Sequence, residues 1–217
     1  HNNSTPPLRT SSVPITKTTH DMTKLRDEAL QLVKQEIAQA AANKLPDAHA
    51  ATLATASLDV TPSIRTIYIE FCEPPGPVFF ANLRSGKGIQ LTENPKAALC
   101  FFWPTLRSQI LLDGSVSVQS REVSEEYWDK RSRESQIAAW ASEQSQPMQD
   151  PDALKQSVSE IKQKFSFDRI PCPDNWAAFQ LLPNRLEFWH SGWERMRKRT
   201  KYFVDAAGNW QVESENP

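Results

Sequence analysis

The sequence predicts an α+β protein whose strands form an antiparallel barrel, closed or nearly closed, with inserted and flanking helices. Two observations support this class. Strand-like segments occupy both ends of the chain with helical segments inserted, and no strand–helix–strand alternation typical of a parallel sheet is visible. Because 217 residues suffice for one large domain, we expect a flexible arm over residues 1–20 and a single domain over residues 21–217.

Composition narrows the class of protein further. Lys and Arg total 25 against 26 Asp and Glu, so no net field would recruit nucleic acid or a membrane surface. No apolar run approaches the roughly 20 residues of a membrane helix, and the N-terminus lacks the apolar core of a signal peptide. The three cysteines are widely spaced without a CxxC motif, so we expect reduced thiols, no metal site and a cytoplasmic protein.

The first half of the chain is expected to pass from a polar arm into a helix and then into strands. Leu25, Ala29, Val33 and Ile37 recur at helical spacing with charges between them, which predicts an amphipathic helix over residues 22–42. β-Branched and aromatic residues between Asp-, Pro- and Gly-containing breaks then predict strands. They cover residues 51–56, 63–71, 77–83, 96–103 and 109–118, with a short helix over residues 85–93.

The second half is expected to be helical first and extended afterwards. Helical spacing predicts one helix beginning at Ser124 and two more over residues 134–142 and 152–165. A Pro-rich segment at residues 170–173 ends this region. The closing strands are expected over residues 177–182, 186–190, 198–204 and 210–212.

The last third of the chain carries a flat aromatic side chain beside a row of cations. If the segment is extended, residues two apart share a face, so Arg195, Arg197 and Arg199 point the same way. Three guanidinium groups on one face repel each other unless an anion or a row of carboxylates lies among them. With Trp189 nearby, the segment is a candidate site for an anionic, planar ligand.

A second candidate site lies at the start of the short helix. The free N–H groups and positive dipole end at Ser85, Gly86 and Lys87 can hold a phosphate, and Arg65 from a strand could complete the clamp. The spacing of a P-loop is absent. The alternative is ordinary, namely a strand arginine paired with a surface carboxylate and a Gly-Lys turn.

A third candidate site is the series Tyr127, Arg131 and Ser135. These residues are four apart, so they would line one helical face and could hold a second oxyanion. A solvated helix face is the alternative. Residues 135–145 also place Gln and Ser side chains around Trp140, which indicates either contacts to the edge of a ring such as a flavin or capping and turn chemistry.

A longer set of motifs is highly specific in its order and spacing. From about residue 47 to residue 210 the chain resembles pyridoxamine/pyridoxine 5′-phosphate oxidase, a family of FMN-dependent split-barrel enzymes that form pyridoxal 5′-phosphate. The motifs that carry the resemblance are Arg65-Thr66-Ile67, Phe79-Phe80-Ala81-Asn82, Ser85-Gly86-Lys87-Gly88, Asn94-Pro95, Ser108-Gln109, Tyr127, the run from Arg131 to Ser142, Gln144-Ser145 and Glu187-Phe188-Trp189.

The resemblance implies a homodimer with two FMN molecules in clefts between the subunits. Arg65 and Lys87 would hold the FMN phosphate. The other implied FMN positions, some of them contributed by the partner subunit, are Thr66, Ile67, Phe80, Ala81, Ser85, Gly86, Gln109, Gln144, Ser145, Trp189 and Arg199.

The resemblance also implies a substrate site. Tyr127, Arg131 and Ser135 would hold the substrate phosphate, Arg195 would cover the substrate ring near the reacting carbon, and Asp47 would lie close by. A hydride would pass from the substrate to the flavin, and dioxygen would reoxidise the flavin.

Two positions depart from the family pattern. Glu70 stands where the family has a phosphate-binding Lys, which replaces attraction to a phosphate by repulsion. Arg197 stands where the family usually has His, and Arg differs from His in shape and donor geometry. We expect Arg195 and Arg197 to be catalytic and Glu70 to face the substrate.

Three functions therefore stay open at this point. The first is oxidation of pyridoxine or pyridoxamine 5′-phosphate in spite of Glu70. The second is an FMN-dependent oxidase of a reduced aromatic carboxylate, as in phenazine biosynthesis, which has no phosphate to satisfy. Glu70 favours the second function, whereas Tyr127, Arg131 and Ser135 favour the first. The third is a split-barrel protein that binds FMN, haem or a pyridoxal phosphate without catalysis. Apart from these functions, a structural or interaction domain with no cofactor also stays open.

Overall fold

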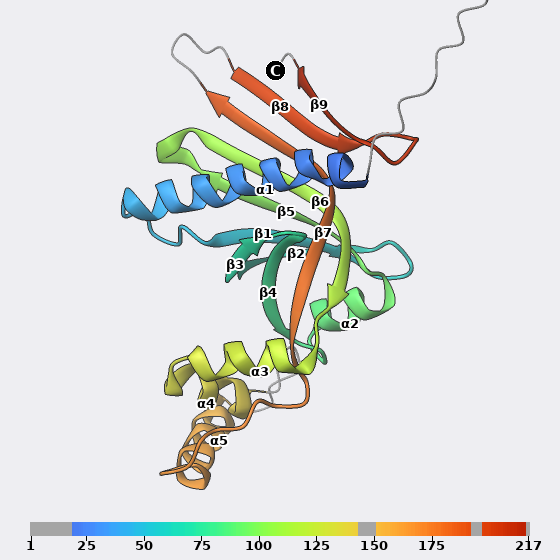
Figure 1. The fold of residues 1–217 in the computed structure, drawn as a ribbon. Coiled ribbons are helices and arrows are strands. Elements are labelled where there is room, and N and C mark those ends of the chain that lie inside the picture. Colours follow the sequence, from blue (N-terminus) through green and yellow to red (C-terminus); the bar gives the residue numbers. More distant parts are fainter. Residues whose placement is uncertain (1–18, 143–150, 192–196, 216–217) are drawn as a thin grey trace, which may run out of the picture.

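The computed structural model describes residues 19–142, 151–191 and 197–215. Strands and helices follow one another mostly in runs along the chain, and the strands do not pair in parallel (Figure 1). The helices are α1 (Thr19–Ala42), α2 (Gly86–Glu93), α3 (Arg121–Lys130), α4 (Arg133–Ala141) and α5 (Pro151–Lys164). The strands are β1 (Ala50–Ala56), β2 (Pro62–Tyr68), β3 (Phe71–Glu73), β4 (Gly76–Asn82), β5 (Lys96–Trp103), β6 (Ser108–Val118), β7 (Trp176–Ser191), β8 (Arg197–Val204) and β9 (Trp210–Glu215).

The strands of the described residues form one curled antiparallel sheet. Its order is β2-β1-β5-β6-β7-β4-β3, and β8 and β9 continue from β7. Every strand pair is antiparallel. Helix α1 lies across the sheet, while α3, α4 and α5 gather at one end of β7 (Figure 1). The arrangement confirms the predicted α+β split barrel with inserted and flanking helices.

A single strand, β7, replaces the two strands predicted over residues 177–182 and 186–190. It pairs with β6 along its length, with β4 near its start and with β8 at its end. Pro183 has no N–H for the ladder, but a register shift between Asp113 and Gly114 lies opposite it, so a bulge accommodates the proline. A Cβ on Gly114 would stand 2.1 Å from the Leu182 carbonyl oxygen, which explains the glycine.

The prediction of one strand over residues 63–71 is wrong, because the structure has two strands there, β2 and β3. Ile69 donates its N–H to the His49 carbonyl oxygen, whereas Glu70 donates to that of Val78 at 2.9 Å. The chain therefore changes its pairing partner from the β1 side to the β4 side between these two residues. This corner places Glu70 outside regular strand structure.

Two apolar clusters support the fold. The larger one lies between α1 and the sheet, where Ala29, Leu30, Val33 and Ile37 are buried at the predicted helical spacing. The smaller one holds the helical end together around Trp128, which is fully buried. The helical end is thus packed on its own core next to the start of β7.

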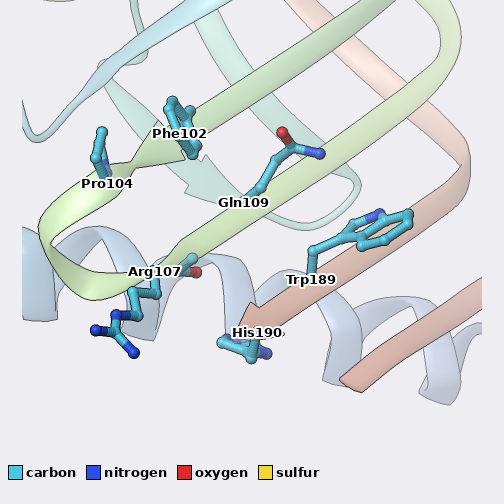
Figure 2. Close-up of a pocket in the computed structure, with 7 residues that line it drawn as sticks. Phe102, Pro104, Arg107, Gln109, Trp189 and His190 are labelled. Atoms are coloured by element: carbon cyan, nitrogen blue, oxygen red, sulfur yellow. The ribbon is translucent and has the colours of Figure 1, made fainter. Parts of the chain in front are cut away.

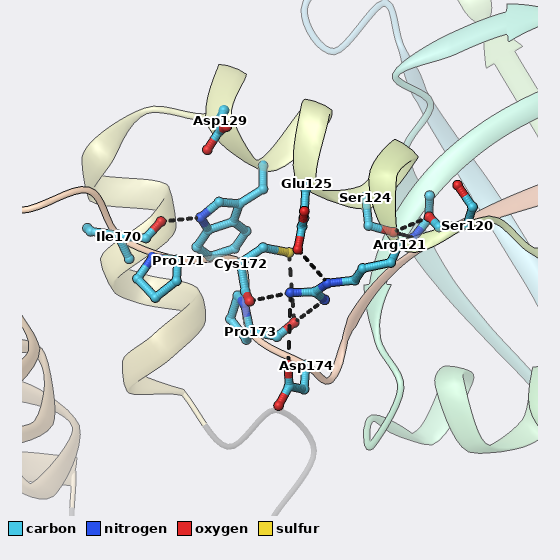
Figure 3. A network of polar contacts seen from close by, with 12 residues as sticks. Ser120, Arg121, Ser124, Glu125, Asp129, Ile170, Pro171, Cys172, Pro173 and Asp174 are labelled. Atoms are coloured by element: carbon cyan, nitrogen blue, oxygen red, sulfur yellow. Dashed lines mark hydrogen bonds and ion pairs between the residues drawn. The ribbon is translucent and has the colours of Figure 1, made fainter.

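Residues 170–173, which lead into β7, are hydrogen-bonded to α3 (Figure 3). Arg121 donates to the carbonyl oxygens of Cys172 and Pro173. Trp128 donates from Nε1 to the Ile170 carbonyl oxygen at 2.7 Å. Hydrogen bonds from a charged donor and from a buried indole hold this segment in a fixed position, and the segment borders a cavity considered below.

Cys72, Cys100 and Cys172 are unpaired thiols. Burial raises the pKa of Cys72 to about 12 and that of Cys172 to about 11, so both thiols are protonated and unreactive near neutral pH. In the described ranges, no helix has the length and apolar character needed to cross a membrane.

Candidate functional site

A serine cap and a glycine contact hold the start of α2 against the end of β4. Ser85 is fully buried, and its hydroxyl accepts from the Gly88 N–H at 3.3 Å and donates to the Asn82 carbonyl oxygen at 2.6 Å. A Cβ on Gly88 would lie 2.3 Å from the same carbonyl oxygen. The Ser85 hydroxyl therefore shapes the helix start through the cap, and its part in a phosphate site stays a prediction. The first-turn backbone at Gly86 and the Lys87 side chain remain for a ligand.

We expect Gly88→Ala to lower the free energy of unfolding by about 1–3 kcal/mol, because its Cβ would push α2 away from backbone carbonyl groups. Gly86→Ala is the matched control two residues away. No atom lies within 4 Å of its ideal Cβ position, so its unfolding free energy should stay within about 0.5 kcal/mol of the parent. Urea unfolding measures both variants, and equal midpoints for the two would contradict this packing.

Arg65 and Lys87 bring two positive charges together beside α2. Arg65, on β2, donates from Nη1 to Thr55 Oγ1 at 2.5 Å, and its Nη2 lies 3.4 Å from Gln90 Oε1. Burial lowers the pKa of Arg65. The pKa of Lys87 is also lowered, mainly by burial and to a smaller extent by the positive charge of Arg65. Within the described residues neither cation forms an ion pair with a carboxylate, so the alternative of a surface pair does not apply there. Two partly desolvated cations close to each other, with Arg65 bonded only to neutral groups, fit a phosphate.

Lys87 borders a cavity of about 340 Å³ at the helical end of the sheet. One wall is aromatic, with the rings of Phe80 and Trp176 stacked at a centroid distance of 4.5 Å. The Arg131 guanidinium carbon lies 5.2 Å from the centroid of the Trp176 ring. The predicted site residues that line this cavity are Phe80, Ala81, Lys87, Arg131 and Ser135.

The predicted helical face of Tyr127, Arg131 and Ser135 is wrong. α3 ends before Arg131, which is its C-cap, and α4 begins after Ser132, so the three residues do not lie on one helix. The turn between the helices brings them together instead. Arg131 and Ser135 line the cavity, and Tyr127 packs on Phe80 at a ring-centroid distance of 4.9 Å. The buried Arg131 Nε has no hydrogen-bond partner in the described structure, which suits an incoming anion.

Polar groups around Trp140 make structural contacts. Gln136 donates from Nε2 to the Trp128 carbonyl oxygen at 2.7 Å, and Trp140 donates from Nε1 to the Pro171 carbonyl oxygen at 2.8 Å. For the described part of residues 135–145, capping and turn chemistry is therefore the better interpretation. The predicted flavin contacts Gln144 and Ser145 lie outside the described residues.

The charge of Glu70 acts on both Tyr127 and Arg131. Burial raises the pKa of Tyr127, and the charge of Glu70 adds to this shift while that of Lys130 opposes it. Burial lowers the pKa of Arg131, and the charge of Glu70 opposes that shift. The carboxylate is thus close enough to act on both candidate anion ligands. It would repel a phosphate placed between them.

The other residues that were predicted to contact a flavin and that the structure describes lie near the opposite end of β7. Gln109 on β6, Trp189 on β7 and Arg199 on β8 are paired directly across three strands, so they form one row. Gln109 and Trp189 lie side by side above a cavity of about 510 Å³ that Phe102 also lines (Figure 2). Arg199 lies over the Trp189 ring, with its guanidinium carbon 4.8 Å from the ring centroid.

The two groups of candidate residues are far apart on one chain. Phe80 is paired with Ala178 near the start of β7, whereas Gln109 is paired with Trp189 near its end. At roughly 3.3 Å per residue, this part of β7 spans about 30 Å or more. One flavin would not contact both ends of β7 in the same chain.

Other predicted residues lie around these two regions. Ile67 is buried in the main core, so only its backbone is open to a cofactor, whereas Thr66 is exposed. Asp47 has a φ of 53° and accepts from the Tyr68 hydroxyl at 2.9 Å. Arg195 lies outside the described residues, as does the side chain of Arg197.

Trp176 and Glu187 lie at these two regions, although neither was predicted as a site residue. Trp176 lines the cavity because β7 pairs it with Asn82 of β4. The two residues are far apart in the sequence, so no local sequence pattern predicts this contact. Glu187 had a signal, because it lies two residues before Trp189 in a predicted strand and so shares its face. It supplies the carboxylate that the arginine row was expected to need.

The sequence of the chain matches those of known proteins. Residues 37–165 match the family model described as pyridoxamine 5′-phosphate oxidase. The chain is 40% identical over 173 residues to the pyridoxine/pyridoxamine 5′-phosphate oxidase of Pelagibacter ubique, covering 79% of this chain and 83% of that protein. It is 39% identical over 184 residues to that of Anaeromyxobacter dehalogenans, covering 85% and 92%.

Two solved structures share the fold. PhzG from Burkholderia lata, in complex with tetrahydrophenazine-1-carboxylic acid, matches with a TM-score of 0.83 and 26% identity, covering 95% of this chain and 100% of that chain. A pyridoxamine 5′-phosphate oxidase-related, FMN-binding protein from Nostoc punctiforme matches with a TM-score of 0.67 and 19% identity, covering 88% and 96%. The fold is therefore that of the FMN-binding split barrels. The chain belongs to the pyridoxamine 5′-phosphate oxidase family.

Proposed function

We propose that the protein is an FMN-dependent oxidase of pyridoxine or pyridoxamine 5′-phosphate. The observation that carries this proposal is the pair of partly buried cations, Arg65 and Lys87, of which Lys87 lines a cavity together with Arg131 and Ser135. Membership of the family supports it. When bound, FMN supplies the acceptor for a hydride from the substrate and passes the electrons to dioxygen.

The side chains of this chain would bind and orient the reactants. Arg65, Lys87 and the backbone at Gly86 anchor the FMN phosphate through charge-assisted hydrogen bonds. Arg131, with its unpartnered Nε, and Ser135 bind the anionic group of the substrate. Holding both reactants by their anionic ends fixes the distance between the reacting carbon and the flavin. Arg195 and Arg197 are proposed to lie near that carbon.

The proposal includes a homodimer. Gln109, Trp189 and Arg199 form a row far from Arg65 and Lys87 on the same chain. A second copy that presents its row to the first chain would complete the flavin shell, and Phe102, 61% exposed beside Gln109, would be covered. The three unpaired thiols support a cytoplasmic location.

A second candidate function is the oxidation of a reduced aromatic carboxylate. Glu70 favours it, because this carboxylate acts on both Tyr127 and Arg131 and would repel a dianionic phosphate. The similarity to PhzG in complex with tetrahydrophenazine-1-carboxylic acid adds support. A single carboxylate needs fewer cationic ligands than a phosphate does.

The test is to mix FMN-loaded protein anaerobically with pyridoxine 5′-phosphate or pyridoxamine 5′-phosphate and to follow the visible absorbance of the flavin. Bleaching that recovers when air is admitted is the expected result. A flavin that stays oxidised with both vitamers but bleaches with a reduced aromatic carboxylate would favour the second function. A flavin that no donor reduces would favour a non-catalytic binding protein, and a protein that ignores added FMN would contradict the proposal.

A further inference from the structure

Glu187 is a buried carboxylate in the row that contains Trp189 and Arg199. Its side chain is 2% exposed. Oε1 accepts from Arg199 Nε at 2.6 Å and from the Trp189 indole N–H, and Oε2 accepts from Arg199 Nη2 at 3.0 Å. One carboxylate therefore binds both residues, in bidentate fashion in the case of the guanidinium.

These contacts fix the orientation of two side chains expected in the flavin shell. With its N–H tied to Glu187, the indole of Trp189 presents its ring face and edge, but no donor, to a ligand. Arg199 is held over the same ring, with its guanidinium carbon 4.8 Å from the ring centroid. The next pair in the ladder, Glu187 opposite Lys201, lies beside the pair of Trp189 and Arg199 on the same face.

The carboxylate stays ionised in spite of its burial. Burial by itself would raise the pKa of Glu187, but the hydrogen bonds from Arg199 and Trp189 and the charge of Arg199 outweigh it, so the pKa is lowered. Glu187 and Arg199 thus form a nearly neutral, oriented pair. A buried carboxylate is costly without such partners, so its placement at this position requires a reason.

We propose that Glu187 is a positioning residue that orients Trp189 and Arg199 toward the flavin and offsets the positive charge of Arg199 there. This inference rests on the proposed binding of FMN, and it adds a residue that touches neither cofactor nor substrate. Removing the carboxylate charge makes the net charge around the guanidinium more positive. Because the reduced flavin is anionic, this more positive surrounding stabilises the reduced form relative to the oxidised form.

The test compares Glu187→Gln with the parent protein. The amide has the shape of the carboxylate but lacks its charge, so the variant should fold. We expect its Kd for FMN to rise about tenfold because Arg199 and Trp189 are held less firmly, and the midpoint potential of the bound flavin to shift to more positive values. Glu213→Gln is the matched control, because Glu213 on β9 pairs with Lys201 at 3.0 Å and its side chain is 42% exposed, in contrast to the buried Glu187. It should change neither quantity.

Two outcomes would overturn the role of Glu187 while leaving the proposed function intact. One is a Glu187→Gln protein whose Kd and flavin potential match those of the parent. The other is a changed Kd with an unchanged potential, which a merely structural role would give. A parent protein without FMN affinity would instead contradict the proposed function.

A measurement on the FMN-free protein tests the positioning separately. The indole N–H resonance of Trp189, identified by its loss in Trp189→Phe, should be shifted downfield by its bond to the carboxylate. It should move upfield in Glu187→Gln and stay in place in Glu213→Gln. An indole resonance that is the same in all three proteins would mean that Glu187 does not hold Trp189, and it would overturn the inference without reference to the cofactor.

Discussion

Lys87→Ala should weaken FMN binding about 10- to 100-fold, and Arg65→Ala should have an effect of the same order, because each removes a charge-assisted hydrogen bond to phosphate. Lys87 lies in the first turn of α2, where burial and repulsion by the charge of Arg65 already lower its pKa. A bound phosphate relieves that repulsion. Quenching of FMN fluorescence on titration with apoprotein measures the Kd of each variant.

The control for this prediction is Lys155→Ala, which removes a lysine from the exposed surface of α5, where its side chain is 81% exposed and pairs with Asp152. Its FMN affinity should match that of the parent. Riboflavin, which lacks the phosphate, provides a second control, because its affinity should be nearly the same in all of these proteins. Unchanged FMN affinity in both Lys87→Ala and Arg65→Ala would eliminate the assigned phosphate site.

The sequence predicted those parts of the fold that local spacing determines. The helix over residues 22–42 and the strand over residues 96–103 match α1 and β5 closely, because buried positions recur along one face of each element. The division between β2 and β3 could not be predicted, because it depends on the carbonyl groups of His49 and Val78. The same holds for β7, which continues through Pro183 because it bulges there, with one more residue than the facing part of β6 between Asp113 and Gly114.

The candidate site shows the same limit. The cluster at Arg65 and Lys87 was predicted from a helix start next to a cationic strand, and the structure brings the two side chains together. Arg131 and Ser135 also meet at one cavity, but through a turn between α3 and α4 and not through helical spacing. Spacing suggested the correct partners there for the wrong physical reason.

The division of the flavin residues into two groups was not evident from the sequence. Trp189 and Arg199 are close to Gln109 only through the ladder of β6, β7 and β8. The length of β7 keeps this row away from Lys87. Under the proposed function, a shell divided in this way would require two copies of the chain, so changes at the sheet face near Phe102 should affect cofactor affinity and dimer formation together.

Glu70→Lys should lower the KM for pyridoxine 5′-phosphate about 10- to 100-fold, because a cation replaces an anion close to Tyr127 and Arg131. Steady-state release of hydrogen peroxide measures this effect. Glu160→Lys makes the same charge change on the exposed face of α5 and should leave the KM unchanged, since the Debye length is about 8 Å at physiological ionic strength. Unphosphorylated pyridoxine should not benefit from Glu70→Lys. An unchanged KM for the phosphate in this variant would mean that Glu70 does not face the substrate.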